Sequence, residues 1–153
     1  MADLRRMRRM LDRYDDAVLR SVFTPRELAA VHRAPAPALR LGVSFGTKEA
    51  CGKALGTGLV GVAWTDIEAL ADGRAVHVRL TGAARERARE RGMRRWRGGW
   101  RAGGTERVLV VVAAGGTSGA LDGLDWADHL RTGKSWECLD TSTPRSSSRL
   151  RWS

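Results

Sequence analysis

Cysteine is scarce in this sequence, and long apolar runs are absent from it. The two cysteines, Cys51 and Cys138, lie far apart and have none of the short spacings of metal-binding cysteines. Neither a disulfide framework nor a structural zinc site is therefore indicated. No apolar run approaches the ~20 residues that cross a bilayer, and no apolar segment follows the arginine-rich start as in a secretory signal. We expect a cytoplasmic protein with no membrane association.

Acidic residues are also few. The chain has 27 Lys and Arg against 17 Asp and Glu, a net charge of +10, so an anionic partner is expected. Nucleic acid, a phosphate-rich cofactor and an acidic protein all fit this charge. The excess of arginine lies in residues 1–40 and 79–107, and the segment between them is close to neutral.

Apolar periodicity and capping signals predict a mixture of helices and strands. The predicted helices are residues 3–20, 24–32, 41–55 and 82–95. The strand signals are a hairpin within 60–80 and a valine-rich buried strand at 107–114. This order predicts an α+β domain over residues 1–115. Residues 116–153 are rich in Gly, Ser and Thr without sustained periodicity, and we predict a mostly disordered tail there.

The stretch "FGTKEACGKALGTG", residues 45–58, raises the question of function. On a helix Phe45, Glu49 and Lys53 share one face, and Lys48 lies about 100° around the axis from Glu49. Glu49 and Lys53 could form a surface ion pair worth a few tenths of a kcal/mol. Alternatively the carboxylate could hold a divalent metal and the lysines could hold phosphates. Spacing alone favours the surface pair and leaves both interpretations open.

The same stretch closely resembles the FxxKEAxxKALGTG signature of the 4'-phosphopantetheinyl transferase superfamily, and is most similar to its small holo-acyl-carrier-protein synthase group. Four other segments resemble that group in the same order, so the resemblance covers roughly residues 3–114. These segments are "VFTPREL" at 22–28, "WTDIEAL" at 64–70, "GRAVHVRLTGAA" at 73–84 and "TERVLVVVAA" at 105–114.

The resemblance implies a small antiparallel sheet packed with helices, in a protein that assembles as a homotrimer. It implies Mg²⁺-dependent transfer of 4'-phosphopantetheine from coenzyme A to a serine of an acyl carrier protein, with release of 3',5'-ADP. Glu49 would be a Mg²⁺ ligand and catalytic, and Lys48 would steady the phosphates or the attacking group. The implied cofactor-binding residues are Lys53, Gly56, Thr57 and Gly58, and the implied carrier-binding residues are Arg6, Met10 and Arg13.

The sequence departs from the family pattern in three places. The family's first strand carries a Gly-x-Asp whose aspartate is a second Mg²⁺ ligand, and alignment puts that aspartate before Met1. A start placed too late and a true loss both explain this, and Asp3 aligns inside the following helix. Ser44 stands where an arginine contacts cofactor phosphate, and Gly104 stands where a histidine is expected.

These departures keep alternatives open. One is a non-catalytic relative that binds carrier protein or coenzyme A. Another, based on composition alone, is a nucleic-acid-binding module using residues 82–101 as a basic patch. The long motif at 45–58 favours the transferase over nucleic acid as the partner.

Overall fold

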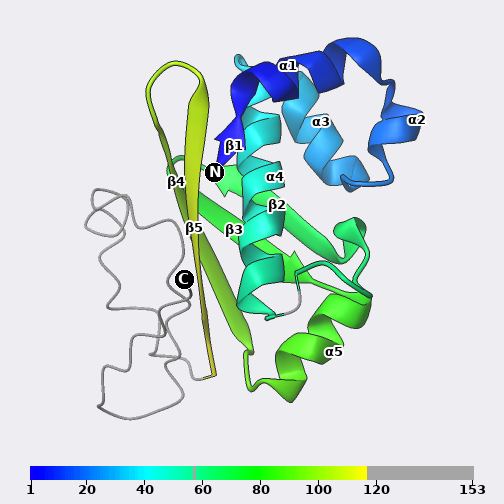
Figure 1. Cartoon of the computed structure of the whole chain (residues 1–153), viewed down its shortest axis with the longest axis vertical. Coiled ribbons are helices and arrows are strands. Elements are labelled where there is room, and N and C mark those ends of the chain that lie inside the picture. Colours follow the sequence, from blue (N-terminus) through cyan, green and yellow to red (C-terminus); the bar gives the residue numbers. More distant parts are fainter. Residues whose placement is uncertain (57, 117–153) are drawn as a thin grey trace.

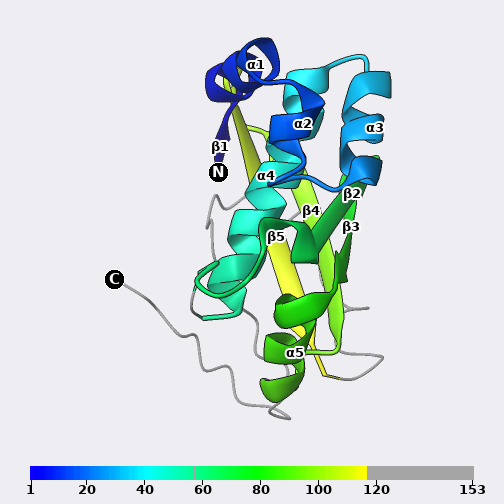
Figure 2. The same ribbon diagram turned by 90° about the vertical axis from the view of Figure 1, so that its right-hand side faces the viewer.

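The computed structural model describes residues 1–56 and 58–116. It shows a five-stranded antiparallel sheet in the order β1-β5-β4-β3-β2, with the described helices on one side of it (Figures 1 and 2). The strands are β1 Ala2–Asp3, β2 Ile67–Asp72, β3 Ala75–Leu80, β4 Arg95–Ala102 and β5 Arg107–Gly115. The helices are α1 Leu4–Arg13, α2 Asp16–Leu19, α3 Pro25–Arg33, α4 Pro37–Ala54 and α5 Gly82–Glu90, with a 3₁₀ turn at Trp64–Asp66.

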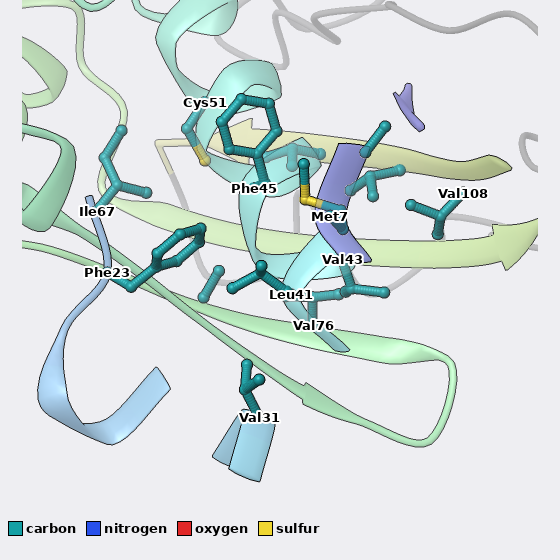
Figure 3. Packing of buried hydrophobic residues seen from close by; sticks show 14 of the residues in the cluster. Met7, Phe23, Val31, Leu41, Val43, Phe45, Cys51, Ile67, Val76 and Val108 are labelled. Atoms are coloured by element: carbon teal, nitrogen blue, oxygen red, sulfur yellow. The ribbon is translucent and has the colours of Figure 1, made fainter. Parts of the chain in front are cut away.

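Helix α4 is the centre of the fold. Its apolar residues Leu41 and Val43 pack among Met7 of α1, Val76 of β3 and Val108 of β5 (Figure 3). A Cβ added to Gly46 would lie 3.0 Å from Cγ2 of Val110, so the glycine lets the helix approach β5 closely. Tight packing on both sides therefore fixes the helix that carries the 45–58 motif.

The predicted α+β class is confirmed, and so are the hairpin and the valine-rich strand. In the hairpin, β2 and β3 pair with Ile67 opposite Leu80 and Ala69 opposite Val78. The start of α3 carries a capping box: the side chain of Thr24 accepts from the amide of Glu27, and the side chain of Glu27 accepts from the amide of Thr24.

The prediction of one helix over residues 3–20 is wrong. Helix α1 ends at Arg13, because Tyr14 is extended with φ −120° and ψ 136°. Asp15 then begins α2 by accepting a hydrogen bond from the amide of Val18 at 3.1 Å. Asp3 does not lie inside α1 as expected but caps it, since its Oδ1 accepts from the amide of Arg5 at 2.8 Å.

Two predicted helix boundaries also shift. Helix α4 begins at Pro37 rather than at residue 41, because a proline fits the first turn, where its missing amide has no helical acceptor anyway. Helix α5 ends at Glu90 rather than at residue 95. Residues 95–102 form β4, which the sequence analysis did not predict, and this strand pairs with both β3 and β5.

The predicted tail lies outside the described residues, except for Gly116. Thr57, one of the predicted cofactor-binding residues, lies outside them as well. None of the helices within residues 1–56 and 58–116 is both long enough and apolar enough to span a membrane.

Candidate functional site

Glu49 lies in the last third of α4, half-buried, one turn before the exposed Lys53. Within the described residues its carboxylate makes no hydrogen bond or ion pair. The α-ammonium group of Met1 lies near enough to be affected by both side chains. Burial lowers the pKa of this ammonium group, while the charge of Glu49 raises it and that of Lys53 lowers it. The site thus holds an accessible carboxylate beside a lysine, at the level where β1 passes α4.

The turn after α4 is built from glycines. Gly56 and Gly58 have φ values of 79° and 61°, which side chains other than glycine adopt at a cost. The turn begins where the amide of Gly56 bonds to the carbonyl of Lys53 at 2.9 Å. The predicted cofactor-binding residues Lys53, Gly56 and Gly58 therefore follow Glu49 along one end of the helix.

Lys48 points the other way, into the protein. Its side chain is fully buried and its Nζ lies 2.9 Å from Oε2 of Glu27 in α3. The same Nζ donates to the carbonyl of Trp64 at 2.9 Å and to the carbonyl of Ile67. All three N–H groups of the ammonium therefore have an acceptor inside the protein. Lys48 and Glu49 are neighbours in the chain, but their side chains do not reach the same surface.

Glu27 completes this buried network in addition to its part in the capping box of α3. Its Oε2 accepts from the amide of Thr24 at 2.7 Å, and its Oε1 accepts from the amide of Ala69 in β2 at 2.9 Å. Burial raises the pKa of Glu27 and lowers the pKa of Lys48, and the ion pair opposes both shifts. The pair ties α3, α4 and β2 together directly behind Glu49. The unusual feature of an internal lysine was not visible in the sequence, because the spacing does not show what packs against each face.

The predicted carrier-binding face of α1 adjoins the site. Arg6 and Arg13 are exposed and Met10 is partly buried. The guanidinium of Arg6 lies 5.4 Å from the ring centre of Phe45, which in turn stacks on Trp64 with ring centres 5.3 Å apart. Phe45 precedes Glu49 by one helical turn on the same face of α4. The basic face of α1 is therefore continuous with the carboxylate through this aromatic pair.

The two other departures from the family pattern are also placed. Ser44 is buried, and its Oγ donates to the carbonyl of Ala69 at 3.0 Å. Gly104 is exposed in the turn between β4 and β5, with φ 70°. Neither position offers a cation to a phosphate.

The donor set around Glu49 limits what it can hold. Within the described residues, no group of three or more His, Cys, Asp or Glu side chains could surround a metal ion. Mg²⁺ retains waters and uses phosphate oxygens, so it needs few protein ligands. A single accessible carboxylate fits a partly hydrated Mg²⁺ and does not fit a metal that requires a full protein cage.

Comparison with known proteins identifies the family of the chain. The family model of the 4'-phosphopantetheinyl transferase superfamily matches residues 1–104. The chain is 43% identical over 90 residues to a holo-[acyl-carrier-protein] synthase of Jannaschia sp. (strain CCS1), covering 57% of this chain and 59% of that protein. It is 44% identical over 89 residues to the one of Methylobacterium sp. (strain 4-46), covering 57% of this chain and 66% of that protein. The chain thus matches less than two thirds of the length of either relative.

Solved structures show the same fold. The crystal structure of holo-[acyl-carrier-protein] synthase from Neisseria meningitidis matches with a TM-score of 0.61 and 27% identity, covering 71% of this chain and 88% of that chain. The Helicobacter pylori structure, in complex with coenzyme A, matches with a TM-score of 0.59 and 18% identity, covering 73% of this chain and 93% of that chain. Since the family model matches more than half of its length, the chain belongs to the 4'-phosphopantetheinyl transferase superfamily.

Proposed function

We propose that this chain transfers 4'-phosphopantetheine from coenzyme A to a serine of an apo acyl carrier protein. The observation that carries the proposal is the accessible carboxylate of Glu49, set between the basic face of α1 and the glycine turn that follows Lys53. Membership of the superfamily and the names of the relatives support it.

In this reaction the serine oxygen forms a bond to the phosphorus that carries the pantetheine. The bond from that phosphorus to the pyrophosphate bridging oxygen breaks, and 3',5'-ADP leaves. A Mg²⁺ ion held by Glu49 would neutralise charge on the phosphates. Lys53 supplies a positive charge to the same phosphates, and the glycines at 56 and 58 let the backbone approach them.

Lys48 contributes by position. Its ammonium is fixed by Glu27 and two carbonyls, so it holds α4 in place relative to α3 and β2. Glu49 is the next residue on the same rigid helix. We assign Lys48 the task of orienting Glu49, because a direct contact with a phosphate would require the buried pair to separate.

The partner surface follows from charge. Arg6 and Arg13, with Met10 between them, form a basic face with an apolar centre on α1, suited to an acidic carrier protein. We also propose a homotrimer, as the family resemblance implies. The side of the sheet away from α4 carries none of the described helices, and we propose it as the face that meets the other subunits (Figures 1 and 2).

The test is a transfer assay with Glu49→Gln. The chain is mixed with coenzyme A, Mg²⁺ and an apo carrier protein, and the mass of the carrier is followed. We expect the wild type to add one phosphopantetheine and Glu49→Gln to lose at least about a hundredfold in kcat, the scale of removing one group that stabilises transition-state charge. Glu90→Gln, an exposed glutamate on α5, is the matched control and should retain full activity. Equal rates for both variants would contradict the role of Glu49.

A non-catalytic binder is the second candidate. It is favoured by the single carboxylate that the described residues offer a metal. It predicts calorimetric binding of coenzyme A or carrier protein with no mass change in the carrier. Turnover by the chain would exclude it.

A further inference from the structure

Two arginines of the arginine-rich segment 79–107 reach the glycine turn that follows α4. Figures 1 and 2 both place α5 beside the carboxyl end of α4. A Cβ added to Gly56 would lie 2.5 Å from each terminal nitrogen of Arg91, so this guanidinium rests directly on the Gly56 backbone. One helical turn earlier, Nη1 of Arg87 donates to the carbonyl of Val60 at 2.8 Å. The side chains of Arg87 and of Arg91, the residue that ends α5, therefore contact Val60 and Gly56 of the turn after α4.

The two arginines differ in what they do there. Arg87 is partly buried and bonded to the turn, so it holds the turn in place. Arg91 is exposed, and its guanidinium has no hydrogen bond or ion pair with the described residues. Glu86 of α5 pairs instead with Arg85 and Arg89, at 3.9 and 3.7 Å, and no ion pair joins the neighbouring Glu90 to Arg91 within the described residues.

The surroundings of Arg91 favour an anion. The sequence of residues 56–61 contains no acidic residue, and Lys53 precedes it by three positions. Arg87 and Arg91 both reach this turn, so its local potential is positive and favours an anion. The guanidinium has several N–H donors in one plane, which matches the oxygens of a phosphate. Gly56 is what permits this approach, because any side chain there would displace the guanidinium.

We propose that Arg91 binds a phosphate of coenzyme A, together with Lys53, and that Arg87 positions the turn for this contact. The inference rests on the proposed function and names a residue outside the 45–58 motif. It also supplies a cation to the phosphates in a chain where Ser44 and Gly104 offer none. A purely structural role, with Arg91 neutralising the carbonyls at the end of α4, is the alternative.

The experiment measures coenzyme A binding by calorimetry and transfer kinetics on the full chain. For Arg91→Ala we expect the Kd and the KM for coenzyme A to rise at least about tenfold, as for a lost charge-assisted hydrogen bond, with kcat and the KM for the carrier little changed. Arg91→Lys keeps the charge without the planar donors and should fall between. Arg89→Ala, an exposed arginine two residues away that faces Glu86, is the matched control and should match the wild type.

Each remaining outcome decides between the interpretations. A lower melting temperature for Arg91→Ala with unchanged Kd and KM would overturn the inference in favour of the structural role. An equal loss for Arg89→Ala would overturn it in favour of general charge. If the wild type binds coenzyme A without transfer, the proposed enzymatic activity is wrong. The Kd of Arg91→Ala for coenzyme A then still decides whether Arg91 binds the phosphate. If the wild type neither binds coenzyme A nor transfers, the proposed function fails and the inference falls with it.

Discussion

At the scale of single residues, the least expected feature is the lysine inside the protein. Lys48 and Glu27 are both fully buried and 2.9 Å apart. Burying two charges costs several kcal/mol, and their attraction together with the surrounding hydrogen bonds offsets that cost. The pair therefore adds little net stability, but replacing one partner alone is strongly destabilising.

Lys48→Met should lower the free energy of unfolding by about 3–5 kcal/mol, because it leaves the carboxylate of Glu27 buried without a counter-charge. Urea unfolding followed by circular dichroism would measure it. The double variant Glu27→Gln with Lys48→Met should recover part of the loss, since no uncompensated charge remains. A loss in Lys48→Met below about 1 kcal/mol would show that water reaches the pair.

At the scale of elements, α1 depends on its cap for the orientation of Arg6 and Met10. Asp3 accepts from the amide of Arg5 at 2.8 Å. This backbone hydrogen bond is the main reason that the pKa of Asp3 lies below its usual value of 3.8, and the amide of Arg6 and the charges of Arg5 and Arg9 act in the same direction. Because the folded pKa is below the unfolded one, the stabilisation is present above the unfolded pKa and is lost as pH falls through the folded one.

We therefore expect the first turn of α1 to open in acid, below pH 3.8. The amide chemical shifts of Arg5 and Arg6, followed by NMR during an acid titration, would report it. Asp3→Asn keeps an oxygen acceptor but has no carboxyl proton, so its amide shifts should not titrate in this range. If Asp3→Asn titrates like the wild type, another group causes the opening.

Strand β4 shows how an element can depend on its neighbours. Its sequence alternates arginine and tryptophan around Gly98 and Gly99, and the side chains of Trp96 and Trp100 pack against the core. The segment before it is rich in arginine and glutamate, so local composition predicts a helix that continues through residue 95. Pairing with β3 and β5, which no local pattern contains, makes residues 95–102 a strand instead.

At the scale of the whole molecule, the net charge of +10 predicts that charge attraction contributes to binding of an acidic carrier protein. The KM for an acidic carrier protein should rise several-fold between about 0.1 M and about 1 M salt, over which the Debye length falls from ~10 Å to ~3 Å. Steady-state kinetics at fixed coenzyme A would measure it. Arg6→Glu should raise this KM at low salt and flatten its salt dependence. A wild-type KM that does not change with salt would argue against docking by charge.

The motif at 45–58 and the α+β class could be predicted from the sequence because both are local. A helical spacing of three and four places Glu49 and Lys53 on one face wherever the helix lies, and alternating apolar residues give the β2–β3 hairpin. The internal direction of Lys48 and the partnership with Glu27 could not be predicted, because they depend on α3 and β2 packing behind α4. The contact of Arg91 with Gly56 could not be predicted for the same reason.

By itself the sequence determined which residues carry charge, which residues can cap a helix, and which family pattern the chain follows. Those properties depend on residue type and on spacing within a few turns. Only the tertiary structure decided that Lys48 is internal, that β4 is a strand, and that Arg87 of α5 and the following Arg91 meet the turn after α4. These depend on contacts between segments tens of residues apart, which form only when burial of apolar surface outweighs the entropy of bringing them together.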